Sequence, residues 1–132
     1  MKIQAISRNV RISPRKVRLV ADAVRNLSVG NALVALKVTR KRAGVAIAKT
    51  IESALANAVN NAKLDKGVLL ISDIEINEGQ ALKRFHPSTR GRIHPYKKRS
   101  SHIRVILEER ISQEVKKAEP KIVEKRREDK KL

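Results

Sequence analysis

The chain has 132 residues, of which 31 are Lys or Arg and 13 are Asp or Glu, so its formal net charge is +18 at neutral pH. This charge predicts nucleic acid or an anionic membrane face as the partner, and the length predicts one domain with a tail. With no cysteine and only 2% aromatic residues, disulfides and thiolate metal sites are excluded, and the expected core is small and aliphatic.

The start of the chain predicts a strand followed by a helix. Apolar and polar residues alternate loosely over residues 2–10, which favours a strand with Ile3 and Ala5 facing the core. Ser13 and Pro14 predict a helix start, because Ser is a good N-cap and Pro costs nothing at the first helical position. The buried stripe of this helix is predicted to comprise Val17, Val20, Ala21, Val24 and Leu27.

Two more helices are predicted after a break at residues 28–31. The first of them is short and should bury Leu33, Leu36 and Val38. Thr39 is the predicted cap of the longer one, which should run from about residue 41 to residue 63. Its buried stripe is predicted to comprise Ile47, Ile51, Leu55, Ala58 and Ala62.

Two later segments read as strands. Residues 68–77 are first continuously apolar and then alternating, and residues 102–107 alternate as a matching partner. With the N-terminal strand they predict an α+β fold over residues 1–110, in which a small three-stranded antiparallel sheet packs on three helices. Residues 111–132 are a nearly balanced Glu/Lys mixture, predicted to be a frayed helix or a disordered tail.

The 25 residues from Gln80 to Arg104 are too many for an ordinary connection between strands. We expect a long extended β-hairpin whose arms of about 12 residues reach roughly 40 Å, at about 3.3 Å per residue. Pro and Gly place its turn at residues 87–91. Between Gly79 and Leu107 the chain has eight Lys or Arg and no acidic residue. Nothing there neutralises the charge, so the hairpin is expected to bind an external polyanion.

Two groups of cations are candidate phosphate contacts. Arginine side chains can hold phosphate oxygens bidentately, and lysines act as point charges. On the hairpin the candidates are Lys83, Arg84, Arg90, Arg92, Lys97, Lys98 and Arg99. The other group surrounds the start of the first helix, where cations are unfavourable unless an anion is bound. Its members are Arg11, Arg15, Lys16 and Arg18.

The two aromatic residues of the chain, Phe85 and Tyr96, both fall in the predicted hairpin. Flanked by cations, they could stack on unpaired bases, which is typical of RNA recognition rather than of duplex DNA. The alternative is a local clasp, in which the two rings contact each other across the hairpin. The sequence leaves both hypotheses open.

No pattern of catalytic or metal-binding residues emerges. His86, His94 and His102 have neither a nearby carboxylate to orient them nor a cysteine to complete a metal site. The S-x-x-K pattern at residues 13–16 lacks the partner motifs of acylating enzymes and is better explained as a helix cap beside cations. The sequence therefore predicts no catalytic residue, no metal and no cofactor.

Several motifs of the hairpin and the helices occur together in one known family. In and beside the hairpin they are Glu78-Gly79, Lys83-Arg84, Pro87, Gly91-Arg92 and residues 98–103, Lys-Arg-Ser-Ser-His-Ile. In the helices they are residues 13–18, Ser-Pro-Arg-Lys-Val-Arg, and residues 52–58, Glu-Ser-Ala-Leu-Ala-Asn-Ala. Over about residues 1–110 the chain thereby resembles the bacterial form of large-subunit ribosomal protein twenty-two.

The resemblance implies a structural constituent of the large ribosomal subunit in the cytoplasm, not an enzyme. Members of that family bind early in subunit assembly, and their hairpin passes through ribosomal RNA to the exit tunnel, where changes at its tip can alter macrolide sensitivity. On this chain the tip would comprise Phe85, His86, Pro87, Ser88, Thr89, Arg90, Gly91, Arg92 and Ile93. The resemblance also adds Ser101, His102 and Arg104 to the candidate ribosomal RNA contacts. Implied partners are large-subunit ribosomal RNA, neighbouring ribosomal proteins and the nascent polypeptide, without homo-oligomers.

Two other functions fit parts of the sequence. An architectural DNA-binding protein could insert a basic β-arm with a proline into the minor groove. Such an arm usually carries an apolar wedge, and the residues Arg84-Phe85-His86-Pro87 fit either function. A membrane-surface protein would need a cationic amphipathic helix with bulky aromatics, which the sequence lacks. The chain also lacks a run of about 18 apolar residues and a secretory signal, so we expect an intracellular protein with no membrane association.

Overall fold

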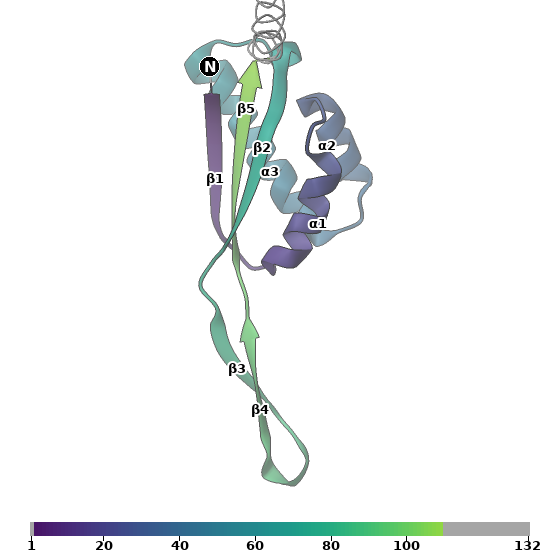
Figure 1. The fold of residues 1–132 in the computed structure, drawn as a ribbon, viewed down its shortest axis with the longest axis vertical. Coiled ribbons are helices and arrows are strands. Elements are labelled where there is room, and N and C mark those ends of the chain that lie inside the picture. Colours follow the sequence, from purple (N-terminus) through teal and green to yellow (C-terminus); the bar gives the residue numbers. More distant parts are fainter. Residues whose placement is uncertain (1, 110–132) are drawn as a thin grey trace, which may run out of the picture.

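The computed structural model describes residues 2–109, and the predictions for residues 111–132 lie outside this range. Its main sheet has three antiparallel strands in the order β1-β5-β2, and the separate strands β3 and β4 form the hairpin (Figure 1). The elements are β1 (Lys2–Val10), α1 (Pro14–Val24), α2 (Val29–Val38), α3 (Arg42–Ala62), β2 (Leu69–Glu78), β3 (Leu82–Pro87), β4 (Ile93–Lys98) and β5 (Ser101–Glu109). The predicted α+β fold is confirmed.

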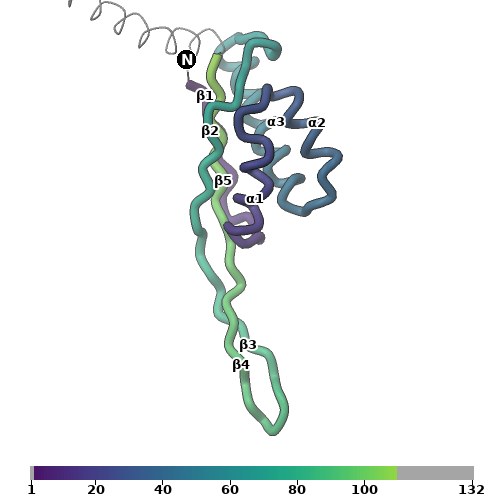
Figure 2. Tube along the Cα trace, turned by 45° about the vertical axis from the view of Figure 1, so that its right-hand side comes forward, coloured from purple at the N-terminus to yellow at the C-terminus, as the bar shows by residue number. Residues whose placement is uncertain are grey.

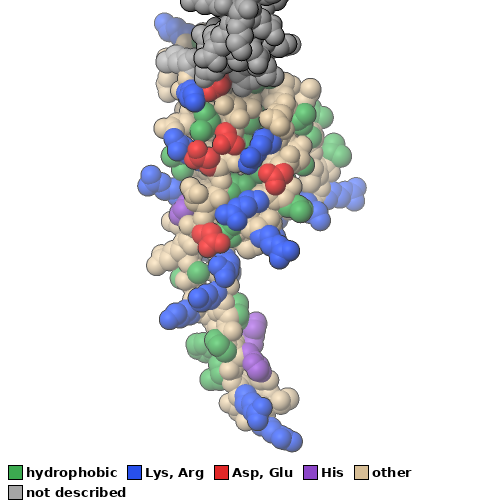
Figure 3. Space-filling model, viewed as in Figure 1, with side chains coloured by type: hydrophobic (Ala, Val, Ile, Leu, Met, Phe, Trp, Pro, Cys, Tyr) green, Lys and Arg blue, Asp and Glu red, His purple; other side chains and the backbone are tan. Residues whose placement is uncertain are grey.

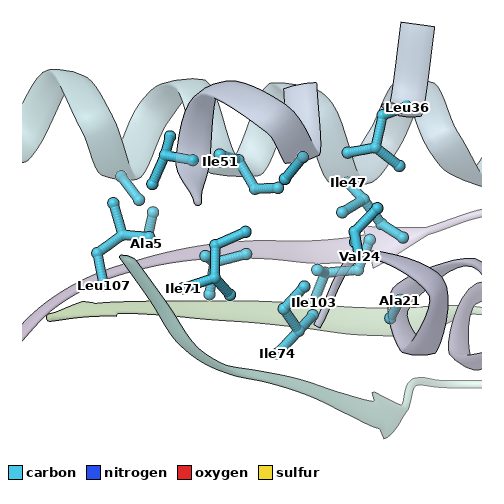
Figure 4. Packing of buried hydrophobic residues seen from close by; sticks show 14 of the residues in the cluster. Ala5, Ala21, Val24, Leu36, Ile47, Ile51, Ile71, Ile74, Ile103 and Leu107 are labelled. Carbon is cyan, nitrogen blue, oxygen red and sulfur yellow. The ribbon is translucent and has the colours of Figure 1, made fainter. Parts of the chain in front are cut away.

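All three helices cover one face of the sheet, and the hairpin projects from its end (Figure 2). Between the two layers lies a core of aliphatic side chains. Ile47 and Ile51 of α3 face the sheet, where Ile103 and Leu107 of β5 are also fully buried (Figure 4). Burying each such side chain contributes about 1.5–3 kcal/mol, so this layer holds the body together without aromatic residues.

Helix α1 begins and ends close to its predicted bounds. Ser13 takes the extended conformation of an N-cap and Pro14 is the first helical residue, although the Ser13 side chain makes no capping hydrogen bond. The chain leaves the helix after Val24, and Asn26 adopts a φ of 72°, in the left-handed region. The predicted stripe is buried as far as Val24, whereas Leu27 beyond the helix is only partly buried.

The junction between α2 and α3 differs from the sequence prediction at two residues. Val38 is 76% exposed, so its predicted burial is wrong. Thr39 ends α2 and does not cap α3, because its Oγ1 and its backbone N–H both donate to the carbonyl oxygen of Ala35, at 2.8 and 3.0 Å. Helix α3 begins at Arg42, after an N-cap residue, Lys41, whose side chain makes no capping hydrogen bond.

The hairpin turns where the sequence predicts. The backbone N–H of Ser88 donates to the carbonyl oxygen of Arg92 at 2.8 Å, closing the turn. Within it, Arg90 and Gly91 have φ values of 55° and 70°. Both values lie in the left-handed region, which glycine enters without a steric penalty.

The root of the hairpin is fixed by two hydrogen bonds. The N–H of Gly79 donates to the carbonyl oxygen of Ser100 at 2.9 Å, and the Ser100 hydroxyl donates to the carbonyl oxygen of Gln80 at 2.6 Å. A Cβ at residue 79 would lie 2.5 Å from the Ser100 Oγ, so the strands can approach this closely because residue 79 is glycine. The hairpin therefore leaves the body from a defined point.

Candidate nucleic-acid interface

The side chains of the hairpin are exposed to solvent. Every residue of β3 and β4 is exposed, and the hairpin carries cations at its root and its end but no acidic side chain (Figure 3). Within residues 2–109, Arg99 at the hairpin root forms an ion pair with Glu78, with 3.6 Å between the guanidinium nitrogen and the carboxylate oxygen. The remaining predicted contacts have no acidic partner there: Lys83, Arg84, Arg90, Arg92, Lys97 and Lys98.

The strand register gives the hairpin two unlike faces. Residues paired directly across an antiparallel ribbon lie on the same face. His86 therefore shares a face with His94, and Arg84 with Tyr96. The opposite face is apolar near the tip, where it consists of the pairs Phe85–Pro95 and Pro87–Ile93. Closer to the root, the same face carries the pair Lys83–Lys97. Figure 3 shows the histidines on one side of the hairpin and hydrophobic side chains on the other.

The register also shows which rings can contact each other across the hairpin. Tyr96 stacks on the ring of His86, with centroids 4.3 Å apart and planes inclined by 9°. Phe85 lies on the other face and is 69% exposed. Tyr96 therefore takes part in a clasp across the hairpin with His86 and not with Phe85, whereas the Phe85 ring has an exposed face.

A pocket at the hairpin root joins the two predicted groups of cations. This root pocket has a volume of about 220 Å³ and is lined by Asn9, Arg11, Gln80, Leu82, Arg84, Lys98, Arg99 and Ser100. Arg11 comes from the loop before α1 and the other three cations come from the hairpin. The fold thus makes one basic surface from residues that are some 70 to 90 positions apart in the chain.

A second pocket, lined by α1 and the segment that enters α3, extends this surface over the body. This helix pocket is lined by Arg11, Ile12, Lys16, Leu19, Val20, Arg40, Lys41, Arg42 and Ala43. Sequence reasoning missed Arg40, Lys41 and Arg42 as candidate contacts. Three consecutive cations at residues 40–42 were a visible signal of anion binding, but the sequence does not show that α3 begins beside α1.

Three of the predicted contacts form hydrogen bonds within the protein, and a fourth is buried. Arg18 donates to the carbonyl oxygen of Ile76 in β2 at 3.2 Å, and Arg104 donates to Glu75 at 3.2 Å and to Gln4 at 2.6 and 3.0 Å. His102 accepts a hydrogen bond on Nδ1 from the N–H of Asn9, at 3.0 Å. These three residues help to join the strands and α1.

For the fourth of these residues, Ser101, the predicted contact has to be corrected. Its side chain is fully buried, because it shares the inward face of β5 with Ile103 and Val105. In this conformation the hydroxyl cannot reach an external RNA, so its predicted contact is wrong. The remaining predicted contact, Arg15, is exposed on α1.

Within 2–109 there is no group of three or more His, Cys, Asp or Glu side chains that could hold a metal ion. Nor does that part of the chain contain a helix long and apolar enough to span a membrane.

Comparison with known proteins agrees with this geometry. The family described as ribosomal protein L22p/L17e matches residues 5–108, a range that includes most of the sheet, the three helices and the whole hairpin. The large ribosomal subunit protein uL22 of Oceanobacillus iheyensis is 44% identical over 110 residues, which cover 83% of this chain and 97% of that protein. The resemblance predicted from the hairpin and helix motifs is confirmed: the chain belongs to the ribosomal protein L22p/L17e family.

Proposed function

We propose that this protein is a structural constituent of the large ribosomal subunit that binds ribosomal RNA, aids subunit assembly and lines the nascent-peptide exit tunnel with its hairpin tip. Its family is one of ribosomal proteins rather than enzymes, and its relative is named for the large subunit. Its place is then the cytoplasm, in the ribosome. Its partners are ribosomal RNA, neighbouring ribosomal proteins and, at the tip, the nascent polypeptide.

One observation carries the RNA part of this proposal: the hairpin is fully exposed, cationic and free of acidic residues. A polyanion gains affinity for such a surface by releasing its condensed counterions. The root pocket places Arg11 of the body beside Arg84 and Arg99 of the hairpin, so that one RNA segment can contact both parts. This arrangement supports binding to folded RNA at the root and along the ribbon.

The tip is proposed to face the tunnel because it lies farthest from the body along the hairpin (Figure 1). It comprises residues 85–93, in which the apolar Ile93 is exposed beside the cationic turn. Such a mixed surface suits a passage for unfolded polypeptide, which presents both apolar and polar groups.

Sucrose-gradient sedimentation of cell extracts tests the ribosomal assignment. We expect a tagged full-length chain to sediment with large subunits, and to remain there after DNase treatment. The DNA-binding alternative predicts that the chain stays away from the large-subunit fractions, and this outcome would refute the proposal.

Replacing Phe85 by Ala should weaken binding to large-subunit ribosomal RNA by about 1–3 kcal/mol, the range for an aromatic ring stacked on one base. The salt dependence should stay unchanged, since no charge is lost. Filter binding at several salt concentrations measures both quantities. Pro95→Ala, on the same face and directly opposite, is the matched control and should have little effect. Equal losses for both variants would show that Phe85 does not stack on a base.

A further inference from the structure

The helix pocket is a concave site on the body, lined by α1 and the segment that enters α3. Its volume is about 470 Å³. Sites for small ligands measure roughly 300–1,000 Å³, so this pocket is large enough to enclose part of a ligand. Five of its nine lining residues are cations and none is acidic: Arg11, Lys16, Arg40, Lys41 and Arg42.

Within residues 2–109, none of these five cations forms an ion pair. The ion pairs of this part of the chain use Lys2, Arg25, Arg99 and Arg104 instead. The side-chain hydrogen bonds of the described residues likewise involve other groups. Five cations around one pocket repel one another, and a bound anion would relieve that repulsion.

The start of α3 adds to the preference for an anion. A helix N-terminus carries a partial positive charge, which acidic residues in the first turn usually offset. Helix α3 has no acidic residue in its first turn, and the side chain of Lys41 does not cap it. Lys41, Arg42 and Ala43 all line the pocket, so the 21-residue helix points its N-terminal end at the same site as the cations.

The rest of the pocket wall is apolar, which indicates a ligand that has an apolar part in addition to a phosphate. It consists of Ile12, Leu19, Val20 and Ala43. Leu19 is 69% exposed, so its side chain is accessible to an apolar group of a ligand. Free phosphate gains nothing from an apolar wall, whereas a nucleobase does. Guanidinium planes such as those of Arg11, Arg40 and Arg42 are also surfaces on which RNA-binding proteins stack unpaired bases.

We propose that the helix pocket binds one unpaired nucleotide of an RNA strand. Its phosphate lies on the cations at the start of α3, and its base packs on Leu19 and a neighbouring guanidinium. The nucleotide must be unpaired, because a base stacked within a duplex cannot enter a pocket. Arg11 lines both the helix pocket and the root pocket, so one strand can pass from the hairpin root onto the body. This proposal rests on the proposed RNA-binding function.

The phosphate part is tested with the variant Arg40→Ala, Lys41→Ala, Arg42→Ala. Its matched control, Lys37→Ala, Lys49→Ala, Lys66→Ala, removes the same charge from exposed residues outside the pocket. The full chain is bound to in vitro transcribed large-subunit ribosomal RNA at several salt concentrations. These three cations surround the single phosphate of the bound nucleotide, so their loss should reduce the slope of log affinity against log salt by about 0.7, the value for one phosphate contact to a single strand. The control should leave the slope unchanged, because its three lysines lie outside the pocket.

The base part is tested with Leu19→Ser and its control Val34→Ser, which is similarly exposed on α2 but outside the pocket. Losing the apolar contact should lower RNA affinity about fivefold without changing the salt slope. The control should leave both unchanged. In amide NMR spectra of the full chain, adenosine 5′-monophosphate should shift the Lys16 and Ala43 signals at lower concentration than inorganic phosphate does.

The outcomes separate this proposal from the proposed function. Equal effects of the pocket variants and their controls, while hairpin variants still weaken binding, would overturn the pocket alone. Equal potency of inorganic phosphate and the nucleotide would overturn the base contact. If the unmodified chain binds the RNA without salt dependence, the proposed function itself is wrong.

Discussion

A protein that lacks its hairpin should keep a folded body and lose nearly all of its affinity for ribosomal RNA. In this variant, residues 82–98 are replaced by Asn-Gly. The two ends are suited to a two-residue turn, because Leu82 and Lys98 are paired and the N–H of Gly79 bonds to Ser100 at 2.9 Å. The excision removes six cations, and the expected loss of affinity is on the order of a hundredfold or more near physiological salt.

The body should tolerate this excision because the hairpin strands form a sheet of their own. None of the buried core residues comes from β3 or β4. The midpoint of thermal unfolding should therefore move by no more than a few degrees, which for a domain of this size is about 1 kcal/mol. Circular dichroism measures the unfolding, and filter binding measures the affinity. RNA affinity within a few fold of the intact chain would show that the main contacts lie elsewhere.

Removing three arginines of the hairpin should flatten the salt dependence of RNA binding. The variant is Arg84→Ala, Arg90→Ala, Arg92→Ala. Each lost phosphate contact is expected to reduce the slope of log affinity against log salt by about one, so the total change is about three. The turn should survive, because Ala has a Cβ as Arg does and meets the left-handed backbone of residue 90 with a similar steric penalty.

The matched control replaces the same three arginines by Lys. Since the charge is kept, the slope should stay close to that of the unmodified chain, while the affinity falls because Lys cannot hold a phosphate bidentately. A salt slope that is unchanged in the Ala variant would contradict phosphate contacts by these arginines.

Sequence reasoning succeeded where the signal is local. Pro14 marks the start of α1, and the Pro and Gly residues of 87–91 mark the hairpin turn, because their backbone preferences act on the nearest residues alone. Helix α3 was found from the spacing of Ile47 and Ile51, since burial of one face repeats with the helical period. These features need no knowledge of the rest of the fold.

The errors and omissions have two sources, which are local choices that the sequence leaves open and contacts between distant elements. Thr39 was assigned to the wrong helix, because a Thr between two helices can end one or begin the next. The stacking of His86 on Tyr96 follows from the pairing register, and the helix pocket follows from the position of α3 beside α1. Ser101 differs from these, since the alternation of Ile103 and Val105 already indicated that residue 101 faces inward.

Because its two faces differ, the hairpin can bind a complementary surface in one orientation about its long axis. A half-turn about the ribbon axis would exchange the apolar Phe85 and Ile93 for the histidine pair, so a surface complementary to one orientation rejects the other. Inserting a single residue in one strand would swap the faces beyond it, because successive side chains point to opposite sides. Inserting two residues in each strand preserves the sidedness. Evolution can therefore lengthen such a ribbon in matched steps of two, but not by one residue at a time.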